Sequence, residues 1–84
     1  MNKVVKYAVS NEKSIRLMES ENKLVFVVDK KANKADIKSA IESFFKVKVE
    51  SVRTLHARDG TKRAYVRFAI ENPAIDVATE LGLI

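Results

Sequence analysis

The sequence predicts an α+β domain in which a mainly antiparallel, four-stranded sheet carries packed helices, in the order β-α-β-α-β-β-α. Two observations support this fold class. Residues 33–46 repeat apolar side chains at helical spacing, whereas the two runs that follow alternate and are separated by Asp59-Gly60. A helix with one apolar stripe must bury that stripe, and the two strands provide the sheet on which it packs.

The helix expected over residues 33–46 has a start signal and two distinct sides. Asn33 can cap it, with Asp36 at the third helical position in a variant of the reciprocal capping box. The expected apolar stripe consists of Ile37, Ala40, Ile41, Phe44 and Phe45. The residues expected on the solvent side are Lys34, Lys38, Ser39, Glu42 and Lys46.

The last two strands are expected to form a hairpin through a two-residue turn at Asp59-Gly60, which pairs Arg58 with Thr61. The face under the helix would then hold Leu55, Ala64, Val66 and Phe68, and the other face Thr54, His56, Arg58, Arg63, Tyr65 and Arg67. This register leaves Arg53 on the apolar face and Val52 on the basic face. A bulge near Glu50-Ser51 would reset the phase.

The first half of the chain predicts two strands and a short helix. Residues 3–9 alternate loosely, with Val5, Tyr7 and Val9 on one face of a short strand. Asn11 can cap a brief helix with Glu12 in its first turn, where a carboxylate suits the helix dipole. Residues 23–29 are apolar on both faces, which indicates a central strand that is covered on both sides.

A last helix is expected near the carboxyl end of the sequence. Asn72 is its predicted cap, and Pro73 fits the first helical position, where a missing N–H costs nothing. Gly82 fits the left-handed position after the helix, and Leu83 can contact Ala78 in a Schellman-type stop.

Length and composition restrict the classes of function. The 84 residues predict one domain over residues 1–84, and the absence of cysteine excludes disulfides and thiolate metal sites. We expect a cytoplasmic protein, because no apolar run approaches the roughly 20 residues that span a bilayer and no signal-peptide core is present. His56 has no cysteine to activate and the carboxylates are scattered, so we expect no enzyme, metal, cofactor or small-molecule substrate.

The net charge of +5 is clustered along the chain. Residues 23–34 contain four lysines and one aspartate, and residues 47–71 contain six Lys or Arg and three Asp or Glu. A clustered excess of cations favours a polyanionic partner.

Basic and aromatic residues together favour RNA binding. Arginine can donate two parallel hydrogen bonds to a phosphate, and an aromatic ring can stack on an exposed base. The hairpin contributes Arg58, Lys62, Arg63, Tyr65 and Arg67, and the loop before the second helix contributes Lys30, Lys31 and Lys34 beside a helix N-terminus. The alternative is an edge hairpin whose cations only deter aggregation. No aromatic pattern of the common four-stranded RNA-binding module is present, which favours recognition of backbone and shape.

The first helix adds an acidic spot to this basic chain. Glu12, Glu19 and Glu21 either belong to a protein-docking surface or form a solvated helix face.

Several motifs resemble one known family over nearly the whole chain. They are Asn11-Glu12-Lys13-Ser14, Lys31-Ala32-Asn33-Lys34 through Ile37, Phe45-Lys46-Val47-Lys48-Val49 with Val52, Lys62-Arg63-Ala64-Tyr65-Val66, and Ile75-Asp76-Val77-Ala78 through Leu81-Gly82. On these motifs the chain resembles the L23 family of large-subunit ribosomal proteins. The last motif resembles the archaeal branch. The short hairpin lacks the long extension of bacterial members and so resembles the archaeal or eukaryotic type.

The resemblance implies a structural constituent of the large ribosomal subunit that binds large-subunit ribosomal RNA near the exit tunnel and contacts neighbouring ribosomal proteins. Arg53, where the family often has Asn, adds a cation to the RNA-binding set. The resemblance also implies a docking surface for the signal recognition particle or a similar exit-site factor, at Glu12, Arg16 and Glu19. In bacterial relatives the chaperone trigger factor uses the acidic residue that matches Glu12. The isolated protein is expected to be a monomer. The alternative is a free-standing small RNA- or protein-binding module of similar fold.

Overall fold

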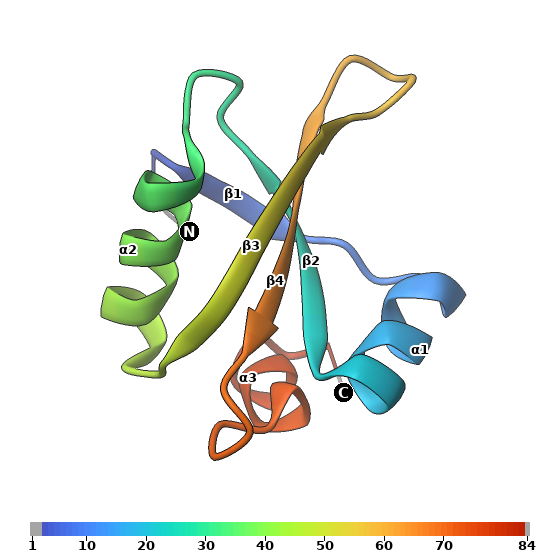
Figure 1. The fold of residues 1–84 in the computed structure, drawn as a ribbon. Helices are drawn as coiled ribbons and strands as arrows, with labels where there is room; N and C mark the ends of the chain where they lie inside the picture. Colours follow the sequence, from blue (N-terminus) through green and yellow to red (C-terminus); the bar gives the residue numbers. More distant parts are fainter. Residues whose placement is uncertain (1–2, 84) are drawn as a thin grey trace.

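A four-stranded antiparallel sheet and three helices make up the computed structural model, which describes residues 3–83 (Figure 1). The strands are β1 (Val5–Ala8), β2 (Lys23–Val28), β3 (Val49–His56) and β4 (Lys62–Phe68), and they lie in the order β1-β2-β4-β3. The helices are α1 (Glu12–Glu21), α2 (Lys34–Phe45) and α3 (Ala74–Glu80). This arrangement confirms the predicted α+β class and the predicted order of elements.

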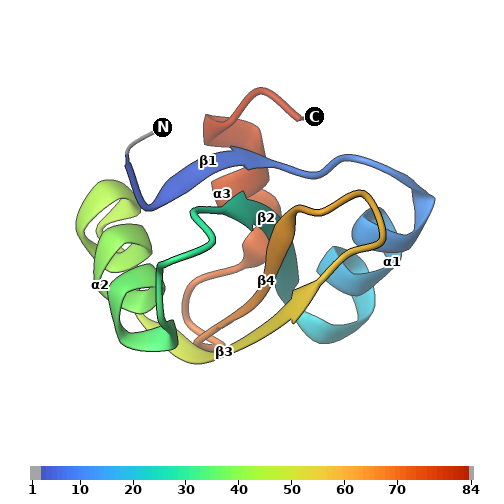
Figure 2. The same ribbon diagram turned by 90° about the horizontal axis from the view of Figure 1, so that it is seen from above.

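Helices flank the strands on two sides. In both Figure 1 and Figure 2, α2 and α1 lie on opposite sides of the strands. The core lies between one face of the sheet and the helices α2 and α3, and Met18 of α1 also contributes to it. Its largest fully buried side chains are Phe26, Phe68, Ile37, Ile41, Val5, Val28 and Val66. We call this face of the sheet the core face and the opposite one the open face.

The central position of β2 explains its apolar sequence. Leu24, Phe26 and Val28 join the core, and Val25 and Val27 point to the open face, where each is only 4% exposed. The predicted central strand, covered on both faces, is therefore confirmed.

Local side-chain caps start the first two helices as predicted. Asn33 Oδ1 accepts a hydrogen bond from the Asp36 N–H at 2.8 Å, and the Asp36 carboxylate accepts one from the Asn33 N–H at 3.2 Å. The cap of α1 is also reciprocal: Asn11 Oδ1 accepts from the Ser14 N–H, and Ser14 Oγ accepts from the Asn11 N–H. Each pair satisfies N–H groups that a helix start leaves without partners.

The apolar stripe of α2 is narrower than predicted. Ile37, Ile41 and Phe45 are buried and Ala40 packs partly against the core, but Phe44 is 53% exposed. Phe44 instead meets the ring of its neighbour Phe45 edge-on, with centroids 4.8 Å apart. Glu42, expected on the solvent side, is half-buried and accepts a hydrogen bond from the Val49 N–H at 2.9 Å, which ties α2 to β3.

The predicted faces of β1 are wrong because the strand contains an irregularity. Its pairing with β2 shifts between Val5 and Tyr7. Val5 and Ala8 consequently lie opposite Val28 and Phe26 on the core face, while Tyr7 lies opposite Val27 and is 56% exposed.

The hairpin turn contains one residue more than predicted. The Ala57 N–H donates to the Thr61 carbonyl at 2.8 Å and the Gly60 N–H donates to the Ala57 carbonyl at 3.1 Å, so three residues form the turn. Gly60 alone has positive φ, +86°, as in a three-residue hairpin with a glycine bulge. The two-residue turn and the pairing of Arg58 with Thr61 are therefore wrong.

The extra turn residue reverses the predicted faces of β3. Val52, Thr54 and His56 pair with Val66, Ala64 and Lys62 on the core face, whereas Arg53 and Leu55 lie on the open face. A bulge near Glu50-Ser51, which the sequence left open, is present: the pairing shifts between Val49 and Ser51, and Val49 lies in the core opposite Phe68. The register predicted for Leu55 and Thr54 was wrong, and correcting it removes the anomalous positions of Arg53 and Val52.

A distant side chain caps α3. Pro73 precedes the helix, and Asn72, the predicted cap, instead accepts from the Lys48 N–H through Oδ1. The cap is Asn22, whose Oδ1 accepts from the Ala74 N–H at 2.6 Å. Asn22 Nδ2 also lies 3.2 Å from each of the carbonyl oxygens of Phe68, Ala69 and Asn72. One amide group thus joins the start of β2, the end of β4 and the start of α3.

The predicted end of α3 is confirmed. Gly82 has φ +75°, its N–H donates to the Thr79 carbonyl, and the Leu83 N–H donates to the Ala78 carbonyl, as in a Schellman motif.

We predict that Asn22→Gly lowers the free energy of unfolding by about 1–3 kcal/mol, because part-buried backbone groups lose their partners. Asn22 has φ 55°, so glycine retains the backbone conformation and the substitution isolates the side chain. Lys46→Gly is the matched control, because Lys46 has φ 56° and ends α2 without comparable contacts. Urea unfolding measures the free energy of unfolding of both variants. Equal stability of the two variants would contradict the role of the Asn22 amide.

Candidate nucleic-acid interface

The open face carries three rows of side chains that cross β3, β4 and β2. In an antiparallel sheet, residues directly opposite each other lie on the same face, with Cβ atoms about 4.5–5.5 Å apart. The rows are Ser51, Arg67 and Lys23; Arg53, Tyr65 and Val25; and Leu55, Arg63 and Val27. The register therefore brings the predicted residues Arg53, Arg63, Tyr65 and Arg67 together on one surface.

Helix α1 covers only the β2 side of the open face. Leu17 and Lys13 of α1 border the same small crevice as Val25, Arg63 and Tyr65. Val25 is consequently buried, while Arg53 and Arg67 are exposed and Tyr65 is half-buried. The β4 and β3 part of the face is left accessible to a partner.

The arginines of the open face make only long ion pairs within the protein. Arg67 Nε lies 3.9 Å from Glu50 Oε1, and one terminal nitrogen of Arg63 lies 3.9 Å from Asp59 Oδ2. Exposed pairs of this kind contribute little to stability. Arg53 has no ion pair within residues 3–83, and Arg63 Nε is buried without a hydrogen-bond partner there. The exposed guanidinium groups of Arg53 and Arg67 retain donors for an anionic partner.

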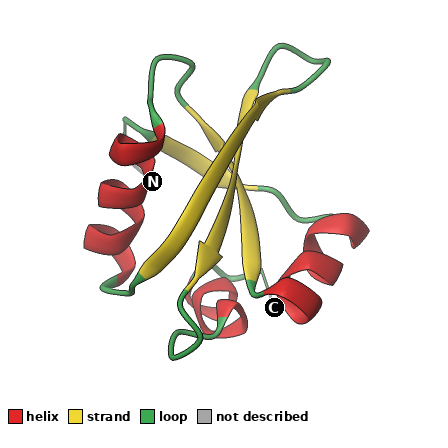
Figure 3. Cartoon of the chain, in the orientation of Figure 1, coloured by secondary structure: helices red, strands yellow, loops and turns green. Residues whose placement is uncertain are grey.

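A second basic surface, here called the basic tip, consists of Lys30, Lys31, Lys34 and Arg58. All four are exposed. The loop after β2 and the turn between β3 and β4 project from the same end of the sheet (Figure 3). The pairing of Lys62 with both Val28 and His56 fixes this proximity.

Lys62 links the loop after β2 to the β3–β4 hairpin. Its Nζ donates to the Ala32 carbonyl at 2.6 Å, and Lys62 is only half-exposed. Lys62 was predicted to bind RNA, but the structure places it on the core face, between the loop and the hairpin.

Short hydrogen bonds also order the turns of the basic tip. Asp29 Oδ1 accepts from the Lys31 N–H at 2.8 Å, and Asp59 Oδ1 accepts from the Thr61 hydroxyl at 2.7 Å and from the Thr61 N–H at 3.0 Å. The Thr61 hydroxyl and then its N–H lower the pKa of Asp59 below its ordinary value. This carboxylate therefore stays ionised in its turn.

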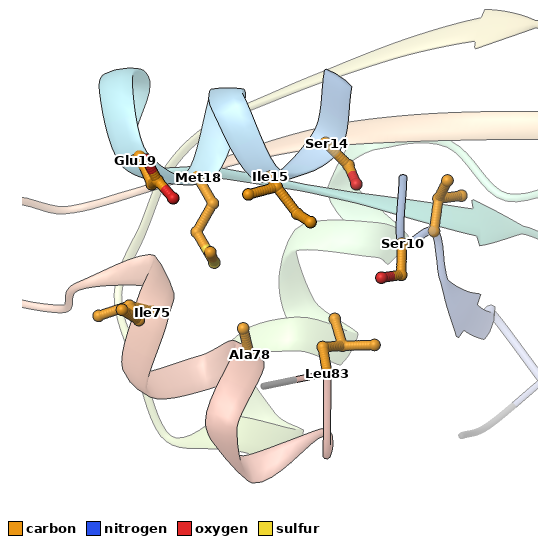
Figure 4. A pocket seen from close by; sticks show the side chains of 9 residues that line it. Ser10, Ser14, Ile15, Met18, Glu19, Ile75, Ala78 and Leu83 are labelled. Atoms are coloured by element: carbon orange, nitrogen blue, oxygen red, sulfur yellow. The ribbon is translucent and has the colours of Figure 1, made fainter. Parts of the chain in front are cut away.

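The predicted docking residues lie together on α1. Glu12, Arg16 and Glu19 are all exposed and recur at helical spacing. Beside them, a groove of about 270 Å³ separates α1 from α3. In Figure 4, Ile15 and Met18 of α1 point toward Ala78 and Leu83 across this groove, and Glu19 lies at its rim.

The described part of the chain holds no candidate metal site. Within residues 3–83, no group of three or more His, Cys, Asp or Glu side chains could hold a metal ion. His56 lies at the exposed end of β3, opposite Lys62. None of the helices described is both long enough and apolar enough to cross a membrane.

Sequence reasoning missed three residues on or beside the open face: Lys23 and Leu55 of the sheet, and Lys13 of α1. Lys23 is two residues from Val25, so strict alternation along β2 places it on the open face. Leu55 was assigned to the other face by the wrong turn length. Lys13 had no sequence signal, because its position depends on how α1 packs against the sheet.

Comparisons with known proteins identify the family of the chain. Residues 3–76 match the family described as ribosomal protein L23. The chain is also 44% identical, over 80 residues, to the large ribosomal subunit protein uL23 of the archaeon Methanococcus aeolicus. That alignment covers 95% of this chain and 93% of the relative. The predicted resemblance is confirmed, and the chain belongs to the ribosomal protein L23 family.

Proposed function

We propose that the protein binds large-subunit ribosomal RNA through the open face and the basic tip, as a structural constituent of the large ribosomal subunit. The observation that carries this proposal is the gathering of Arg53, Arg63 and Arg67 around Tyr65 on one accessible face. Membership of the L23 family gives the ribosomal context, and this family is structural rather than enzymatic. The protein therefore works in the cytoplasm, in the large subunit, among ribosomal RNA and other ribosomal proteins.

The proposed mechanism is neutralisation of RNA phosphates. Each phosphate contact by Arg or Lys releases condensed counterions, which drives binding and makes it sensitive to salt. Arg63 and Arg67 are four residues apart on β4, or about 13 Å at the usual strand rise, so they reach separate phosphates. Lys30, Lys31 and Lys34 of the basic tip lie near the N-terminus of α2, whose dipole also favours an anion.

Sedimentation tests the ribosomal assignment directly. We expect the protein in a cell lysate to sediment with the large subunit, at about one copy per subunit, and to remain there after a high-salt wash. Recovery at the top of the gradient would favour the alternative, a free-standing RNA- or protein-binding module.

We predict that Arg63→Gln with Arg67→Gln reduces the slope of log K against log salt by about 2, because each lost phosphate contact removes about 1. Glutamine retains part of the aliphatic stem, which matters because Arg63 is partly buried. The matched control is Lys38→Ala with Lys48→Ala, which removes two charges outside both basic surfaces. Binding to a large-subunit rRNA transcript is titrated at several KCl concentrations. An unchanged slope would show that the open face is not part of the RNA interface.

A second proposed function is docking of a nascent-chain targeting factor on α1. Its support is the exposed set Glu12, Arg16 and Glu19 beside the groove, with the apolar side chains of Ile15 and Ile75 45% and 49% exposed. The acidic rim and apolar lining suit a segment that combines cations with apolar side chains. In the ribosome this factor would be the signal recognition particle or a similar exit-site factor.

We predict that Glu12→Lys weakens binding of the signal recognition particle to ribosomes about tenfold or more, which corresponds to about 1.4 kcal/mol. Opposite charges would be replaced by like charges at the docking surface. Glu71→Lys serves as the control, since Glu71 is exposed and outside the groove. Ribosome pelleting measures factor binding, and sedimentation verifies assembly. Equal binding of the factor to both variant ribosomes would indicate that Glu12 belongs to a solvated helix face and not to a docking surface.

A further inference from the structure

We propose that a hollow on the open face is a subsite for a single unpaired nucleotide of RNA, whose base stacks on Tyr65 and whose phosphate is held by the cations around it. This inference rests on the proposed RNA-binding function and specifies what the open face recognises. The hollow has a volume of about 330 Å³ and is lined by Lys13, Lys23, Arg53, Thr54, Leu55 and Tyr65. Small-ligand sites have volumes of about 300–1,000 Å³, so the hollow suits one nucleotide.

Tyr65 is positioned as a stacking platform. It lines a crevice of only about 20 Å³ beside Leu17 and Val25, and it also lines the larger hollow. Packing against α1 and β2 thus supports the ring from one side. The ring is half-buried and needs little further ordering when a base stacks on it.

Three cations from three different elements surround the ring. Arg53 lies directly opposite Tyr65 on β3, Lys23 comes from β2 and Lys13 from α1. No carboxylate is among the described residues that line the hollow. Lys23 Nζ nevertheless pairs with Glu21 Oε1 at 2.9 Å, so Arg53 and Lys13 are the cations of the hollow without an ion pair within residues 3–83. Leu55, 42% exposed, adds an apolar contact for the edge of a base. A nucleotide combines one flat apolar ring system with one phosphate, and the hollow offers a partner for each.

The geometry of stacking favours an unpaired nucleotide over a duplex. Bases inside an A-form helix are stacked and paired, so a protein ring reaches a base only in a loop, bulge or end. Among residues 3–83, Tyr65 is the only one with an aromatic side chain that lines the hollow. One ring provides a stacking position for one base, whereas the other arginines of the open face extend toward flanking phosphates.

Equilibrium binding of the intact protein to synthetic RNA tests the subsite. The probes are a short RNA duplex with one bulged adenosine, the same duplex with an abasic residue in the bulge, and the uninterrupted duplex. We expect the bulged adenosine to bind about tenfold more tightly than the abasic probe, because stacking of one base contributes on this scale. Equal affinity for these two probes would overturn the subsite while leaving RNA binding intact. No binding of any probe at low salt would overturn the proposed RNA-binding function and the subsite with it.

Two substitutions of Tyr65 test whether its ring causes the preference for the bulged adenosine. Tyr65→Leu should abolish the preference for the bulged adenosine without changing affinity for the uninterrupted duplex, whereas Tyr65→Phe should retain the preference. A bulged 2-aminopurine provides an independent signal, since stacking on an aromatic ring quenches its fluorescence. Persistence of the preference and of the quenching in Tyr65→Leu would overturn the assignment to Tyr65. The wild-type comparison of probes needs no variant and holds even if a substitution impairs folding.

Discussion

The alignment of β3 on β4 is the constraint on which both the core and the functional surface depend. Side chains alternate along a strand, so a shift by one residue would exchange the two faces of β3. The three-residue turn, made possible by the positive φ of Gly60, sends Val52 to the core and Arg53 to the accessible face. A turn shorter by one residue would place the Arg53 guanidinium under α2, where burial of an unpaired charge is costly. The irregularity after Val49 then restores an apolar residue opposite Phe68.

Unequal cover of the two sheet faces creates the accessible surface. On one side, α2 and α3 seal the core, whereas α1 has ten residues and shields mainly β2 on the other. The apolar residues of that face, Val25 and Val27, belong to β2, and the cations belong mostly to β3 and β4. Helix α1 therefore covers the apolar residues of this face, which require burial, and leaves the arginines in contact with solvent.

Structural features that depend on residues close together in the sequence could be predicted. Features that depend on contacts between distant residues could not. The caps of α1 and α2 and the stop at Gly82 involve residues within a few positions, so they could be read directly. The cap of α3 comes from Asn22, 52 residues before Ala74, and nothing in the sequence links the two. Asp-Gly is compatible with turns of two or three residues, so the alignment of β3 was ambiguous. Arg63, Tyr65 and Arg67 were assigned to one face correctly because they alternate on a single strand, whereas Lys62 on the same strand turned inward.

The contacts of Asn22 make the closing of the fold a late event. Its amide partners all lie between Phe68 and Ala74, at least 46 residues later in the chain, so they are synthesised well after Asn22. Until then the α1–β2 corner lacks the groups that satisfy it. The same side chain couples the α1–β2 corner to the start of α3, so local opening of α3 removes one of its hydrogen-bond partners. A protein assembled in this way matures as one cooperative unit rather than from its N-terminus onward.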